Sequence, residues 1–215
     1  MPPAVSPKSE LRSHIRSARR SMTAADRSQS DNSLVSAFST MVRTASARTV
    51  AAYVPLPAEP GGAALLDALA AVAPRLLLPV LLPSRDLDWA AYDGTLAAGP
   101  FGLSEPTGPR LGVDAVRSID LMLVPALAVA RDGTRLGQGG GSYDRVLARV
   151  TAPTIVPLHP GELLPSVPAE PHDQRVCGVV VGSTTGYETA HLHWTKGCAI
   201  PHYWHSIGLS ANDGG

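Results

Sequence analysis

The sequence predicts an α/β fold of three layers, in which helices cover both faces of a mostly parallel, mixed sheet. Short apolar runs alternate with segments whose apolar residues recur at helical spacing. The run at 118–130 is almost continuously apolar, as is typical of a strand buried on both faces. A glycine-rich segment follows it, at the position where open α/β sheets bind ligands. With 215 residues, we expect one domain over 1–181 and a C-terminal tail of unknown role over 182–215, where no period is evident.

The N-terminal part of the chain predicts two amphipathic helices. Ser6 followed by Pro7 is a typical helix start, and Thr23 to Asp26 resembles a capping box. Apolar residues recur at helical spacing after each start: Leu11, Ile15, Ala18 and Met22, and then Leu34, Val35, Phe38 and Val42.

The rest of the chain alternates between predicted strands and helices. Pro79 indicates an edge or a bulge in its strand. Strands are expected at 48–55, 75–82, 86–94, 118–130, 154–158 and 175–181, and helices at 61–73 and 143–150.

Composition argues against several classes of partner. Lysine plus arginine number 18 and aspartate plus glutamate 18, so no overall field favours nucleic acid or a membrane surface. Residues 1–10 lack the apolar core of a signal peptide. We therefore expect a soluble, cytoplasmic protein with no nucleic-acid and no membrane partner.

Residues 133–145, GTRLGQGGGSYDR, are the strongest candidate site. Backbone amides exposed by this many glycines can converge on phosphate oxygens, although the segment is neither a Walker A motif nor a dinucleotide fingerprint. A turn whose glycines merely permit tight packing is the alternative. Arg135 and Arg145 offer forked donors for phosphate. Asp144 could hold magnesium or could simply complement the dipole of the next helix.

A stripe of cations lies on the first predicted helix. Its members stand at helical spacing: Lys8, Arg12, Arg16 and Arg19. Such a stripe is usually a solvated face, and the spacing alone does not show that it reaches the glycine-rich loop.

In five segments the chain resembles the 5-formyltetrahydrofolate cyclo-ligases, also called methenyltetrahydrofolate synthetases. The segments are K-x-x-L-R at 8–12, AAYVPLPAEPGG at 51–62, FGLSEP at 101–106, 119–145, and VPAEPHD at 167–173. The resemblance implies a monomeric enzyme that uses ATP and Mg²⁺ to convert 5-formyltetrahydrofolate to 5,10-methenyltetrahydrofolate, releasing ADP and phosphate through a phosphorylated formyl intermediate. A catalytically silent folate- or nucleotide-binding module and a sugar-phosphate isomerase-like enzyme are the alternatives.

The resemblance also implies a role for each matching residue. ATP would be bound by Lys8, Arg12, Arg135, Leu136, Gly137, Gln138, Gly139, Gly140, Gly141, Ser142 and Tyr143, with Arg135 and Arg145 as catalytic cations. The folate would contact Val54, Glu59, and residues Gln138, Gly139, Gly140, Gly141 and Ser142, with Glu59 at the amino-pyrimidine end of the pterin. Asp144 and Asp173 would bind Mg²⁺. The family commonly has an aromatic residue or arginine at position 138 and an aromatic residue at 142, so Gln138 and Ser142 depart from its pattern.

Overall fold

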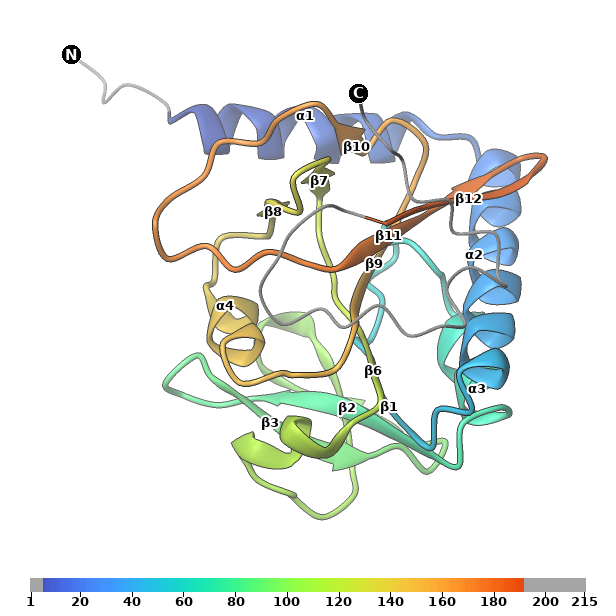
Figure 1. Cartoon of the computed structure of the whole chain (residues 1–215), viewed down its shortest axis with the longest axis vertical. Helices are drawn as coiled ribbons and strands as arrows, with labels where there is room; N and C mark the ends of the chain where they lie inside the picture. The colour runs from blue at the N-terminus through green and yellow to red at the C-terminus, as the bar shows by residue number, and fades with distance from the viewer. Residues whose placement is uncertain (1–5, 192–215) are drawn as a thin grey trace.

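A seven-stranded sheet forms the centre of the molecule in the computed structural model, which describes residues 6–191 (Figure 1). Five neighbouring strands are parallel and an antiparallel strand closes each edge. In spatial order the strands are β12 (Gly186–His191), β11 (Gly178–Ser183), β9 (Thr154–Leu158), β6 (Leu121–Leu123), β1 (Thr49–Ala51), β2 (Arg75–Leu81) and β3 (Leu87–Ala91).

Both faces of this sheet are covered, which confirms the three-layer α/β prediction. Helices α2 (Ala24–Thr44) and α3 (Ala64–Ala70) bury Leu34, Phe38 and Leu65 against one face. The other face packs against the short helices α4 (Ser142–Leu147) and η2 (Val113–Ser118), through side chains including those of Val146 and Val116. The two apolar layers hold the sheet rigid, and the loops at its carboxyl edge carry the candidate site.

A smaller module packs beside the main sheet. It consists of α1 (Pro7–Ser21) and a three-stranded sheet in the order β10 (Leu163–Leu164), β7 (Ala128–Ala130) and β8 (Arg135–Leu136). Ile15 of α1 is buried in the same cluster as Leu127 and Leu136. A two-stranded ribbon of β4 (Leu96–Ala98) and β5 (Ser104–Pro106) flanks the turn η1 (Pro100–Gly102).

Both predicted helix starts are confirmed. The Ser6 side chain accepts a hydrogen bond from the backbone N–H of Ser9 at 3.3 Å, and Thr23 accepts one from Asp26 at 3.1 Å. Each cap satisfies a backbone donor that the first turn of a helix leaves unpaired. These side chains therefore fix where the two helices begin.

The predicted strand at 118–130 is two strands in two different sheets. Val124 still donates to Ile155 of the main sheet, whereas Leu127 donates to Leu136 in the smaller one. Pro125 lies between them and has no N–H to continue the ladder. The glycine-rich loop consequently follows β8, the second strand of the β7–β8 hairpin, rather than the long apolar run itself.

The structure also differs from the expected tail boundary and from the expectation for Pro79. Strand β11 continues through residue 181 to Ser183, and β12 pairs with it as far as His191, so the sheet includes residues 182–191. Residues 192–215 lie outside the described part. Strand β2 is not at an edge, but β1 pairs with it only as far as Leu77, so Pro79 lies beyond that pairing.

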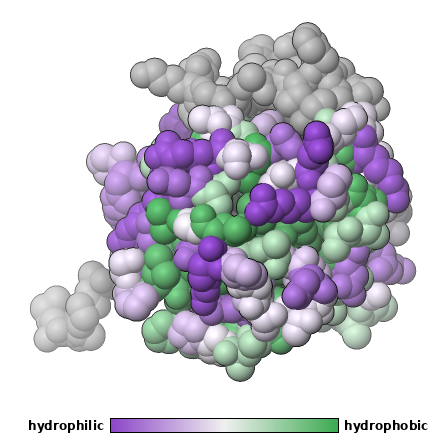
Figure 2. Space-filling model, turned by 90° about the horizontal axis from the view of Figure 1, so that it is seen from below, coloured by the Kyte–Doolittle hydropathy of each residue, from purple (hydrophilic) through white to green (hydrophobic). Residues whose placement is uncertain are grey.

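One face of the molecule gathers apolar residues near its middle, with hydrophilic residues around them (Figure 2). Within 6–191, no helix has both the length and the apolar character needed to cross a membrane.

Candidate active site

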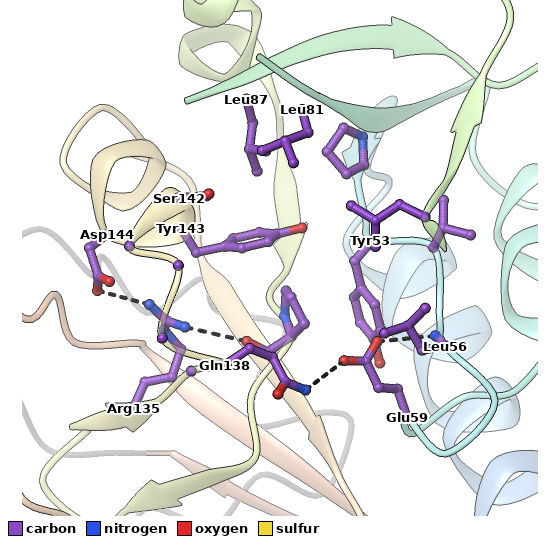
Figure 3. A pocket seen from close by; sticks show the side chains of 18 of the residues that line it. Tyr53, Leu56, Glu59, Leu81, Leu87, Arg135, Gln138, Ser142, Tyr143 and Asp144 are labelled. Carbon is purple, nitrogen blue, oxygen red and sulfur yellow. Dashed lines mark hydrogen bonds and ion pairs between the residues drawn. The ribbon is translucent and has the colours of Figure 1, made fainter. Parts of the chain in front are cut away.

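One cavity of about 270 Å³ collects nearly all the residues that the sequence singles out. It lies between the glycine-rich loop and the segment that follows β1 (Figure 3). Of the predicted site residues, only Arg145 does not line the cavity. The predicted residues that do line it are Lys8, Arg12, Val54, Glu59, Arg135, Leu136, Gly137, Gln138, Gly139, Gly140, Gly141, Ser142, Tyr143, Asp144 and Asp173.

The glycine-rich loop joins β8 to α4 and depends on glycine at specific places. A Cβ at Gly137 would lie 2.6 Å from Nη1 of Arg135, so a side chain there would displace the end of this guanidinium. Gly139 has a φ of 103°, which side-chain-bearing residues rarely adopt. The loop is therefore shaped around Arg135, whose side chain is largely buried.

Two residues of the cationic stripe of α1, Lys8 and Arg12, line the cavity, whereas Arg16 is exposed and Arg19 is buried outside it. The Nζ of Lys8 donates to Asp173 at 2.7 Å, and the Nε of Arg12 donates to the carbonyl of Gly137 at 3.0 Å. Arg16 donates to the side-chain oxygen of Gln138 at 2.6 Å. The first helix thus holds the loop and one predicted metal ligand at the same time.

The two predicted metal ligands each accept a hydrogen bond from a cation of the site. Arg135 donates to Oδ1 of Asp144 at 2.8 Å, while Lys8 and the backbone N–H of Glu170 donate to Oδ2 of Asp173. Burial would raise the pKa of Asp173, but the hydrogen bonds and the charge of Lys8 lower it below its ordinary value. Burial alone would lower the pKa of Lys8, but its contacts with the carboxylates of Asp173 and Glu170 raise this pKa above its ordinary value. Asp173 is therefore held ionised.

This pair of carboxylates fits a magnesium ion that also binds phosphate. Asp144 accepts from Arg135 and from the backbone N–H of Gln174 through Oδ1, which leaves Oδ2 as an acceptor for a metal. Mg²⁺ typically takes one or two carboxylates and completes its shell with phosphate oxygens and water. Residues 6–191 contain no cluster of three or more His, Cys, Asp or Glu side chains suited to a metal, so an all-protein cage is not present there.

Glu59 lies at the opposite end of the cavity and is 9% exposed. Its Oε2 accepts from the backbone N–H of Leu56 at 3.1 Å, and its Oε1 accepts from the amide of Gln138 at 3.2 Å. Tyr53 and Tyr143 project into the space beside it from opposite sides (Figure 3). The carboxylate is fixed in orientation and flanked by aromatic rings.

Two polar atoms at the cavity lack a partner within the described residues. They are the hydroxyl of Tyr143 and the Nε of Arg135, both buried. Burial, followed by the charge of Glu59, raises the pKa of Tyr143, so its hydroxyl stays protonated and can donate. Buried polar groups are normally hydrogen-bonded, so both atoms indicate that a polar ligand completes the site.

Sequence reasoning did not assign the apolar wall of the cavity. Leu81 and Leu87 face Tyr143 from the β2–β3 side (Figure 3). Their strand patterns are those of ordinary core residues, so no local signal marks them. Glu105, from the FGLSEP segment, also lines the cavity and accepts from the backbone N–H of Leu81 at 2.8 Å. Other unassigned lining residues are Tyr53, Leu56, Pro79, Leu103, Ser104 and Pro125.

Arg145 points elsewhere in this structure. It is exposed, and its Nη1 lies 3.4 Å from the carbonyl of Arg85. Its position one residue after Asp144 on α4 turns it away from the side that lines the cavity.

Comparison with known proteins identifies relatives over most of the chain. The model of the 5-formyltetrahydrofolate cyclo-ligase family matches residues 4–182. A 5-formyltetrahydrofolate cyclo-ligase of Mycolicibacterium smegmatis is 45% identical over 181 residues, which are 80% of this chain and 92% of the relative. One from Haemophilus influenzae is 27% identical over 180 residues, covering 80% and 96%. The solved Aquifex aeolicus 5,10-methenyltetrahydrofolate synthetase is similar in fold, with a TM-score of 0.73 at 24% identity, covering 91% of this chain and 98% of that one.

Proposed function

The chain belongs to the 5-formyltetrahydrofolate cyclo-ligase family, and on that premise we propose that it closes 5-formyltetrahydrofolate to 5,10-methenyltetrahydrofolate with consumption of Mg²⁺-bound ATP. The family identifies the chain as an enzyme that acts on a folate. The use of ATP, the metal, the intermediate and the residue roles are the proposed part.

A single observation carries this proposal. The cavity has two chemically different ends, which are spanned by residues 138–142 of the glycine-rich loop. One end holds Lys8, Arg12 and Arg135 with two carboxylates, and the other holds Glu59 among aromatic and aliphatic side chains. This arrangement suits a polyphosphate beside a flat heterocycle with polar edges.

At the phosphate end, two of the three cations are already paired with a predicted metal ligand. Lys8 lies 2.7 Å from Asp173 and Arg135 lies 2.8 Å from Asp144. Arrival of ATP with Mg²⁺ would supply a cation for the carboxylates and phosphate oxygens for Lys8 and Arg135. Buried charges would thus remain compensated before and after binding, which avoids the cost of a solitary buried charge.

At the folate end, the acceptor capacity of Glu59 matches the pterin. An ionised carboxylate has about four lone-pair positions, and Leu56 and Gln138 occupy one on each oxygen. One position on each oxygen remains. The amino-pyrimidine edge of a pterin presents two N–H donors side by side, so it can fill both. Val54, Leu81 and Leu87 provide apolar contact for the ring.

The chemistry needs positioning and charge neutralisation rather than a protein nucleophile. The formyl oxygen attacks the γ-phosphorus of ATP and the bond to ADP breaks. The neighbouring folate nitrogen then attacks the formyl carbon, loses its proton, and expels phosphate as the ring closes. Arg135 and the amides of Gly139 and Gly140 neutralise the phosphoryl oxygens during transfer, and the loop holds the two substrates in line.

Asp144 and Asp173 would hold the magnesium ion. When bound, Mg²⁺ supplies positive charge to the phosphate oxygens and orients them. The lowered pKa of Asp173 keeps that ligand ionised well below neutral pH.

Incubation with 5-formyltetrahydrofolate, ATP and Mg²⁺ tests the proposal. We expect the near-ultraviolet absorbance of methenyltetrahydrofolate to grow with stoichiometric release of ADP, and to depend on added Mg²⁺. Ligand binding in calorimetry without ADP release at any protein concentration would instead indicate a silent binding module. Protection by a phosphosugar and not by ATP would indicate the isomerase-like alternative.

A further inference from the structure

Hydrogen bonds connect three side chains from α1 to Glu59, in the order Arg16, Gln138 and Glu59. Arg16 donates to Oε1 of Gln138 through Nη2 at 2.6 Å and through Nε at 3.2 Å. Gln138 donates through Nε2 to Oε1 of Glu59 at 3.2 Å. Gln138 spans the gap between the glycine-rich loop and the segment carrying Glu59 (Figure 3).

The chemistry of the two outer groups fixes the orientation of the amide between them. A guanidinium has only donors and an ionised carboxylate only acceptors. Gln138 can satisfy both only when its oxygen faces Arg16 and its NH₂ faces Glu59. If the amide turned over, its oxygen would face the carboxylate and its NH₂ would face the guanidinium, so both contacts would become repulsive.

We propose that Arg16 is a positioning residue for folate recognition, which acts through Gln138 to hold the carboxylate of Glu59 in the plane that receives the pterin. This inference rests on the proposed role of Glu59. Arg16 is exposed and does not line the cavity, so it acts without contact to either substrate.

The same contacts connect the two halves of the site. Arg16 stands on the helix face that also carries Lys8 and Arg12, which contact Asp173 and Gly137. Gln138 belongs to the loop predicted to lie between the substrates. The position of α1 therefore sets both the cations at the phosphate end and, through Gln138, the acceptor at the folate end.

A double-mutant cycle tests the proposal. We expect Arg16→Gln to raise the Kd and KM for 5-formyltetrahydrofolate roughly three- to tenfold, the effect of about one hydrogen bond, with kcat and the KM for ATP within about twofold of the parent. Gln138→Ala should weaken folate binding to a similar extent. In the Gln138→Ala background, Arg16→Gln should not weaken it further, because the relay, the connection from Arg16 through Gln138 to Glu59, is already broken.

Arg20→Gln is the matched control, since Arg20 is exposed on the same helix and lies outside the cavity. It should leave the folate Kd unchanged, and all variants should keep the parent's thermal unfolding midpoint. If Arg16→Gln raised the folate Kd equally in both backgrounds, the relay would be overturned, and Arg16 would instead attract the carboxylates of the folate directly. No loss from Arg16→Gln would overturn it as well.

Glu59→Gln separates this inference from the proposed function. If Glu59→Gln weakens folate binding but Arg16→Gln does not, only the relay is wrong. If Glu59→Gln leaves folate affinity unchanged, the pterin end is wrong and the relay fails with it.

Discussion

The guanidinium of Arg135 donates to Oδ1 of Asp144 at 2.8 Å inside the cavity, with the two side chains 4% and 23% exposed. A predicted phosphate-binding cation and a predicted metal ligand are therefore in contact before any substrate arrives. The pairing fixes the orientation of both groups.

Asp144→Asn should abolish turnover while preserving the fold. The change deletes one negative charge but little volume. We expect kcat to fall by on the order of 10²-fold or more, which is the typical effect of removing one preorganised electrostatic contact from an active site. Steady-state kinetics and thermal unfolding measure the two effects. Asp86→Asn is the control, because it removes the Asp86–Arg149 pair of similar exposure outside the cavity. Near-normal activity of Asp144→Asn would contradict the metal role.

Glu59→Gln should impair folate binding selectively. One carboxylate oxygen becomes an NH₂ group, which cannot accept from a pterin N–H, so we expect the folate Kd to rise about 10- to 100-fold. The KM for ATP should change by less than about twofold, because Glu59 lies across the cavity from Asp144 (Figure 3). Calorimetry with 5-formyltetrahydrofolate gives the Kd. A rise confined to the KM for ATP would refute this placement.

Arg19→Met should destabilise the protein. Arg19 is 3% exposed and donates to both carboxylate oxygens of Glu162 at 2.7 and 2.9 Å, and to the carbonyl of Ala126. Leaving Glu162 buried without its partner should lower the free energy of unfolding by about 3–5 kcal/mol. Arg19→Met with Glu162→Met should recover part of this loss. Urea unfolding measures both, and Arg20→Met, an exposed control, should stay within about 0.5 kcal/mol of the parent.

Acidification should reduce stability through His159. This residue is fully buried, and burial followed by the charges of Arg19 and Arg27 lowers its pKa from 6.5 to about 4. Between these values the unfolded chain binds more protons than the folded one, so stability falls as the pH drops. From pH 7 to pH 5 the parent should lose about 2 kcal/mol more than His159→Gln in urea unfolding. Parallel pH profiles for the two proteins would exclude this role.

The elements predicted most reliably are those fixed by local chemistry. The caps at Ser6 and Thr23 each bond to the backbone three residues away, so the local sequence contains the whole interaction. The alternation of strand and helix likewise predicted the three layers. Strand β12 was not predicted, because its pairing with β11 is a tertiary contact and Tyr187 and Glu188 give no clear alternation.

The candidate site was predictable only in part. The glycines, Asp144 and Arg135 lie close together in sequence, and their composition alone indicates an anion site. The orientation of α1 was not predictable, because a cationic stripe on an isolated helix looks the same whether it faces water or a loop. Glu59 and Asp173 depended on the family resemblance, since each is an ordinary loop carboxylate when considered alone.

The contact between Lys8 and Asp173 joins residues 165 positions apart in sequence. Closing so long a loop lowers the entropy of the chain before any stabilising contact forms. Non-local contacts of this kind therefore slow folding. During synthesis, almost all of the described chain must emerge before Asp173, the predicted metal ligand that Lys8 contacts, is present. Nucleotide affinity should therefore appear only at the last stage of chain assembly, which would make ATP binding a reporter of complete folding.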